Sequence, residues 1–86
     1  MINSKHDIIM LLKEIGIYTT RDRIEDFVSF FQTLEQQHGR NKLLYTLKTF
    51  CSDENATHAF LIALSGNPFY GFILDELHTI LNKTDS

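Results

Sequence analysis

The spacing of the apolar residues constrains this chain more than any other feature of its sequence. The clearest example lies between residues 21 and 37, where the apolar side chains fall on one arc of about 160° of a helical projection. These residues are Ile24, Phe27, Val28, Phe30, Phe31 and Leu34. Polar residues of the same segment, such as Glu25 and Gln32, fall on the opposite arc. This period is typical of an amphipathic α-helix that buries one face.

Turn and capping residues divide the helical pattern into about five short segments. The expected α-helices span residues 5–15, 21–37, 41–51, 53–64 and 68–81. Ser4 and Asp7 form a start that resembles a capping box, because a hydroxyl and a carboxylate three residues apart can satisfy free backbone N–H groups. Gly16 ends the first segment, since glycine readily takes the left-handed conformation of a helix terminus. Asn67 and Pro68 are typical of a helix start and open the last segment.

Three places in this pattern leave an alternative open. Residues 41–51 also alternate in the manner of a strand, although their apolar residues fit a helix better. Residues 59–64 are apolar all round, which fits either a central helix or a short buried strand. Gly71 either lets another backbone come close or marks a later start of the last helix. With helices at all these places, the sequence predicts an all-α, compact orthogonal bundle around the fourth helix.

The length of 86 residues corresponds to one domain, residues 1–86, with frayed ends at about 1–4 and 83–86. The single cysteine, Cys51, cannot form an internal disulfide. The sequence contains neither an apolar run of about 18 residues nor a basic and apolar leader. We therefore expect a cytoplasmic chain without a membrane span, whose stability comes from packed side chains.

The histidines and the cysteine do not form a recognisable metal-binding or catalytic pattern. His6, His38, His58 and His78 are never three or four residues apart, whereas a metal site needs three or four convergent ligands. An enzyme that uses Cys51 as nucleophile with His58 or His38 as base is the third of three hypotheses. Cys51 lies on the apolar face of its predicted helix, where a thiol is usually inert. We therefore expect no catalytic residue, no metal, no cofactor and no enzymatic activity.

The remaining signal is an excess of apolar and aromatic residues. A small domain has little interior, so we expect part of this excess to form an exposed patch of the kind that marks interaction sites. The predicted patch consists of Phe30, Tyr45, Phe69, Tyr70 and Phe72, with Lys42 and Lys48 as charges at its rim. The first hypothesis is therefore a non-enzymatic helical module that binds and regulates a partner protein. The same patch also allows a homo-oligomer.

A second hypothesis concerns the basic stretch at residues 38–48, which holds no acidic residue. Its residues Arg40, Lys42 and Lys48, with the outward aromatic Tyr45, have the chemistry to bind phosphate and to stack on a base. This pattern fits a regulator of transcription or replication that associates with nucleic acid. The net charge of −3 has the opposite sign to that of most nucleic-acid-binding proteins, which makes nucleic acid the less favoured partner.

Two tracts of the sequence carry a resemblance to known proteins. The first is LLKEIGIYT at residues 11–19, and the second joins TFCS at 49–52 to AFLIAL at 59–64. In style and length the chain resembles the small accessory proteins of T-even-type bacteriophages, among which the cytoplasmic lysis-inhibition accessory proteins are nearest in kind. The resemblance implies a helical protein that binds the cytoplasmic part of a holin and delays lysis. No site residue follows from it, because no signature aligns residue by residue.

Overall fold

The computed structural model of the chain describes residues 1–84 and shows an all-α fold. In chain order, with η for a 3-10 helix, the elements are α1 (Lys5–Glu14), η1 (Asp22–Phe27), α2 (Val28–His38), α3 (Arg40–Phe50), α4 (Glu54–Leu64), η2 (Pro68–Tyr70) and α5 (Phe72–Thr84). No part of residues 1–84 forms a strand. The helical interpretation of residues 41–51 and 59–64 is therefore confirmed.

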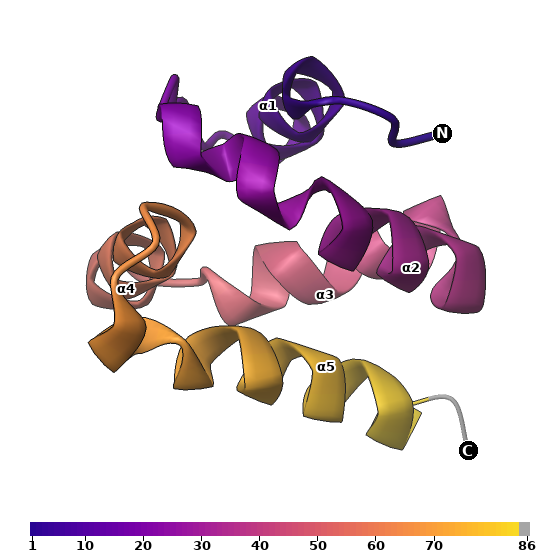
Figure 1. Ribbon diagram of the computed structural model, residues 1–86. Coiled ribbons are helices and arrows are strands. Elements are labelled where there is room, and N and C mark those ends of the chain that lie inside the picture. Colours follow the sequence, from indigo (N-terminus) through magenta and orange to yellow (C-terminus); the bar gives the residue numbers. More distant parts are fainter. Residues whose placement is uncertain (85–86) are drawn as a thin grey trace.

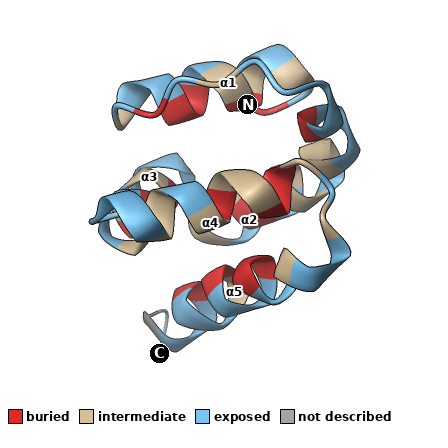
Figure 2. Ribbon diagram, turned by 90° about the vertical axis from the view of Figure 1, so that its left-hand side faces the viewer, coloured by how far each residue is buried: buried red, intermediate tan, exposed pale blue. Residues whose placement is uncertain are grey.

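The helices cross one another at large angles (Figure 1). In this view α1 and α4 are seen nearly end-on, whereas α2, α3 and α5 lie across it. In the view turned by 90°, α1 and α5 form the outer tiers, and α2, α3 and α4 lie between them (Figure 2). The Cα radius of gyration is 11.7 Å, close to the value of about 12 Å typical of a globular domain of this length. The predicted compact orthogonal bundle is thus confirmed.

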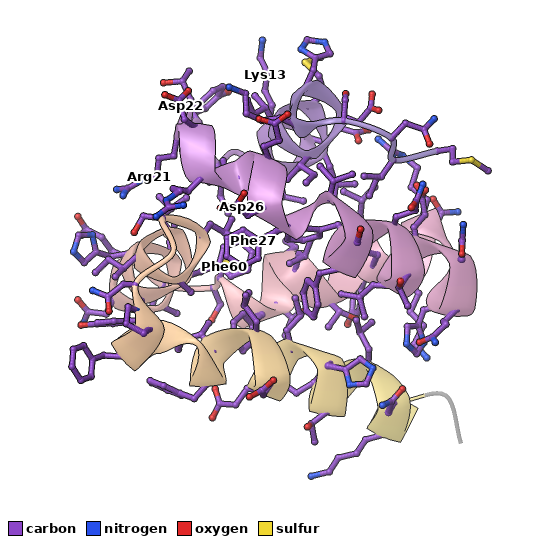
Figure 3. The ribbon with its side chains drawn as sticks, viewed as in Figure 1. Lys13, Arg21, Asp22, Asp26, Phe27 and Phe60 are labelled. Atoms are coloured by element: carbon purple, nitrogen blue, oxygen red, sulfur yellow. The ribbon has the colours of Figure 1, made fainter. Side chains whose placement is uncertain are left out.

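Phe60 of α4 lies at the centre of an aromatic contact that joins three helices. Its ring meets Phe31 of α2 and Phe50 of α3 edge-on, with ring centroids 6.5 and 6.2 Å away. Edge-to-face contacts of this kind are favourable because the positive edge of one ring faces the negative face of the other. Figure 3 shows Phe60 and Phe27 in the interior of the bundle, whereas Asp22 points outward. Phe60 joins α4 to the core in this way, but α4 itself stands at one side of the bundle (Figure 1), and the predicted central position of the fourth helix is therefore wrong.

The prediction of one continuous helix over residues 21–37 is wrong in its first part. The 3-10 segment η1 occupies residues 22–27, and the α-helix begins only at Val28. Arg21 provides no side-chain cap for η1, and Phe27 departs from helical dihedral angles with φ −107° and ψ 9°. The segment η1 packs on α1 and α4, whereas α2 packs on α3. The break at Phe27 therefore lets the two halves of this amphipathic segment bury their apolar side chains in different parts of the core. Tertiary packing here overrides a continuous local pattern.

The last helical segment also starts in two steps. Asn67 Oδ1 accepts a hydrogen bond from the backbone N–H of Phe69 at 2.9 Å, and Pro68 opens the 3-10 turn η2. The α-helix α5 begins at Phe72, so Gly71 stands between the two elements. Of the two roles considered for Gly71, the structure shows the later start of the helix.

The two chain ends differ from the predicted frayed segments. The prediction for residues 1–4 is wrong at Ile2, whose side chain is fully buried in the core. At the other end, α5 extends to Thr84, beyond the predicted helix end at Leu81. The remainder of the predicted frayed tail, residues 85–86, lies outside the described residues.

A network of polar contacts attaches this buried N-terminus to the bundle. The backbone N–H of Ile2 donates to Glu35 Oε1 at 2.8 Å, and Glu35 Oε2 accepts from Arg40 Nη1 at 3.4 Å. Arg40 also binds the carboxylate of Glu14 through Nη2. Glu35 therefore connects the N-terminus and α3 to α2, and Arg40 extends the connection to α1.

The start of α1 has the capping box that the sequence predicts. The Asp7 N–H donates to Ser4 Oγ at 3.3 Å, while Asp7 Oδ2 accepts from the Asn3 N–H at 2.9 Å and from Ser4 Oγ at 3.2 Å. The hydrogen bond from Asn3, followed by that from Ser4, holds the pKa of Asp7 below its ordinary value, because both favour the ionised carboxylate.

We expect these capping bonds to make part of the free energy of unfolding depend on pH in the acidic range. The pKa of Asp7 is lower in the folded chain than the value of roughly 3.9 in an unfolded chain. The ionised carboxylate therefore contributes fully to the free energy of unfolding above that value, and this contribution is lost as the pH falls through the folded pKa. Denaturant unfolding from about pH 5 to about pH 2 measures this dependence. Asp7→Asn should show a shallower fall in stability, because its amide does not titrate. An identical acid profile for both proteins would contradict the assignment.

We also expect Glu35→Ala to destabilise the fold by about 1–3 kcal/mol, because it removes the acceptor of the Ile2 N–H and an acceptor of Arg40. Because the Glu35 side chain is only 10% exposed, water can replace it only poorly as an acceptor for the Ile2 N–H and Arg40. Chemical denaturation measures the loss. Gln36→Ala, at an exposed position one residue further along α2, serves as the control and should be close to neutral.

Candidate protein-binding groove

A groove opens between α3 and α5. The two helices pack side by side and run in opposite directions (Figure 1). The groove has a volume of about 570 Å³, and it is lined by Lys42, Tyr45, Thr46, Thr49, Phe50 and Ile80. The α3 residues of this set recur at intervals of three and four, so they share one flank of the helix.

The wall formed by α3 presents an exposed aromatic ring. Leu43 and Leu47 are fully buried on the core side of the helix, and this orientation turns Tyr45 outward, where it is 73% exposed. The hydroxyl of Thr49 donates to the carbonyl oxygen of Tyr45 at 3.0 Å. Because this hydroxyl is satisfied within the helix, it does not require a polar partner in the groove.

Phe50 and Ile80 connect the groove to the core. Phe50 is half-buried, and its ring both lines the groove and meets Phe60 edge-on. Ile80 is 38% exposed and follows one turn after Leu77, which is fully buried. The groove is therefore backed by packed side chains, and its shape depends on the same contacts that hold the bundle together.

A second hollow, also of about 570 Å³, continues from Ile80 along the outer side of α5. It is lined by Phe72, Asp75, Glu76, Thr79, Ile80 and Lys83. Phe72 is 55% exposed, and Tyr70 stacks on it with ring centroids 6.3 Å apart. Since Ile80 belongs to both hollows, they form one surface, which we call the α3/α5 face.

Charge is distributed unevenly along the α3/α5 face. Lys42 lies in the first turn of α3, and Lys83 lies in the last turn of α5. Because the helices are antiparallel, these two lysines lie toward the same end of the face, while Asp75 and Glu76 lie toward the other end. The face thus has a basic end, an acidic end and an apolar centre at Ile80.

The structure brings part of the predicted patch together on this face. Lys42 and Tyr45 line the groove, and Phe72 lines the adjoining hollow. The predicted patch omits Ile80, the one residue that lines both hollows. Ile80 lies at the edge of the apolar arc that Ile73, Leu77 and Leu81 form on the fifth helix, and this position is the signal that could have found it.

The other predicted patch residues lie elsewhere or are partly covered. Phe30 is half-buried and packs against the ring of Phe31 at a centroid distance of 5.5 Å. Tyr70 is also half-buried, and it contributes to the face only through its stack on Phe72. Phe69 is 84% exposed in η2, and Lys48 is exposed on α3 without lining the groove. Of the predicted patch, Phe30, Phe69, Tyr70 and Lys48 thus lie outside the lining of the two hollows.

The basic residues considered for nucleic-acid binding differ in their surroundings. Arg40 is engaged by the carboxylates of Glu14 and Glu35, which offset its charge. Lys42 borders the groove beside Tyr45, whereas Lys48 lies outside it. Of these three cations, only Lys42 therefore lines the groove.

Cys51 stands at the C-terminal end of α3 and is half-buried. Burial raises the pKa of its thiol to about 11, against a smaller opposing effect of the Thr57 hydroxyl. Burial also lowers the pKa of His38, and the charge of Lys42 acts in the same direction. Among residues 1–84, no three His, Cys, Asp or Glu side chains gather in a way that could hold a metal ion.

Comparison with protein-family models, with curated proteins and with solved structures finds no match to this chain. Across residues 1–84, no helix combines the length and the apolar character needed to cross a bilayer.

We expect the Cys51 thiol to react slowly with a disulfide reagent at neutral pH, because the raised pKa leaves little thiolate. The reaction should accelerate as the pH approaches about 11. Unfolding in urea should accelerate it at neutral pH, since it exposes the thiol. A fast reaction of the folded protein at pH 7 would contradict this expectation and would favour the hypothesis of a cysteine nucleophile.

Proposed function

We propose that the protein is a non-enzymatic helical module that binds and regulates a partner protein through the α3/α5 face. The observation that carries this proposal is the groove between α3 and α5, where Tyr45 and Ile80 are exposed beside half-buried Phe50. An apolar centre with charged residues at both ends has the anatomy of a protein-binding surface. Aromatic side chains such as Tyr45 are common anchors of such surfaces.

A protein partner fits this face better than a small ligand does. Pockets for small molecules cover most of the surface of the ligand. Here the apolar area extends from Tyr45 across Ile80 to Phe72, along the length of a helix rather than around one enclosed centre. An amphipathic helix of a partner has the shape to lie in such a groove, with apolar residues on the face that it buries.

The high pKa of Cys51 supports the non-enzymatic part of the proposal, because a protonated thiol is a poor nucleophile. The ion pairs of Arg40 weigh against the alternative of a nucleic-acid-associated regulator. A cytoplasmic location, and a role in delaying lysis of the kind that the resemblance implies, stay predictions.

Site-specific photo-cross-linking tests the proposed function. A benzophenone side chain placed at Tyr45 should form a defined cross-linked product in the native cells, because the ring lies in the binding groove. The matched control places the same side chain at Tyr18, which is also 73% exposed but lies between α1 and η1. We expect no defined product at Tyr18. No product at Tyr45, or the same products at both positions, would contradict the proposal.

A further inference from the structure

We propose that the occupant of the α3/α5 face is a second copy of this chain, which binds about a two-fold axis. Each copy places the outer side of its α5 in the groove between α3 and α5 of the other copy. The interface then consists of four helices, two from each copy. This inference rests on one part of the proposed function, the use of the α3/α5 face to bind a protein, and it names a second copy as the protein bound there.

The charges of the α3/α5 face make it complementary to itself. A two-fold interface joins the same surface of both copies and exchanges the two ends of that surface. Lys42 and Lys83 lie toward one end of the α3/α5 face, and Glu76 lies toward the other. A half-turn therefore places the basic end of each copy over the acidic end of the other.

The positions of the charges along α5 define the register of the pair. The midpoint between Glu76 and Lys83 falls between Thr79 and Ile80, and all four residues line the same hollow. With the axis at this midpoint and the α5 helices antiparallel, each Glu76 lies opposite Lys83 of the second copy. Exposed ion pairs add little stability individually, but they select orientation and register.

The apolar residues follow the same geometry. Ile80 lies beside the axis, where it meets the α5 of the second copy, and this contact covers a side chain that is 38% exposed in the single chain. Tyr45 borders the groove that receives that helix. Phe72 reaches the basic end of the second copy, where Lys42 offers an ammonium group to the face of its ring. Burial of these three apolar side chains drives the association.

Charge also distinguishes a second copy from an unrelated partner helix of one sign. A uniformly acidic helix is attracted by Lys42 and Lys83 but repelled by Asp75 and Glu76 on the same face. A uniformly basic helix meets the opposite conflict. A second copy satisfies both ends at once, because it carries the same charges in reverse order.

Charge reversal combined with mixing tests the inference. Glu76→Lys and Lys83→Glu each place two pairs of like charges across the axis, so each variant alone should associate at least about tenfold more weakly than the wild type. An equimolar mixture should regain association, since every contact is then between opposite charges. Sedimentation velocity over a range of concentrations follows the mass from the monomer, 10.0 kDa, toward twice that value. Lys13→Glu, an exposed charge reversal on α1, is the matched control and should behave as the wild type.

Two outcomes would overturn the inference: a wild-type chain that stays monomeric at every concentration, or charge variants that the mixture does not rescue although circular dichroism shows them folded. The cross-linking at Tyr45 separates this failure from failure of the proposed function. A product between two copies supports the inference. A product only with a different protein overturns it and leaves the proposed function standing, whereas no product overturns both.

Discussion

The edge-on packing of Phe60 against Phe31 and Phe50 is the contact on which the rest of the structure depends. Each of these residues comes from a different helix, so the three rings hold α2, α3 and α4 in their crossed arrangement. Phe50 belongs to the core through Phe60 and to the groove through its other surface. The shape of the α3/α5 face is thus a consequence of core packing rather than of flexible surface side chains.

The position of α5 explains why an apolar surface remains exposed. In the tiered arrangement of Figure 2, α5 is an outer layer, and its buried residues lie on the side that packs against the bundle. Leu77 and Leu81 are fully buried there, while Phe72 and Ile80 remain partly exposed. A chain of 86 residues has few elements with which to cover a fifth helix on both sides. The exposed apolar residues on this helix are therefore available to a second molecule.

The charged residues at the two ends of this apolar surface are of opposite sign. The acidic residues near the start of α5 and Lys83 in its last turn suit the dipole of the helix, which favours anions at the N-terminus and cations at the C-terminus. The same order that is favourable within one helix makes two antiparallel helices complementary. The apolar centre contributes the greater part of any association, and the charged ends decide in which orientation it occurs.

The helices and their approximate limits follow from the sequence alone, because capping and amphipathic spacing act within a few residues. Ser4 with Asp7, and Asn67 with Pro68, mark two helix starts in this way, and Tyr45 and Lys42 can be placed on an outward flank. The break at Phe27, the burial of Ile2 and the position of Ile80 opposite Tyr45 depend on residues far apart in the chain. Only the tertiary structure decided them, because the free energy of these features comes from contacts between elements. A local pattern shows that a side chain needs to be buried, whereas the packing of the whole chain determines which side chains are left uncovered.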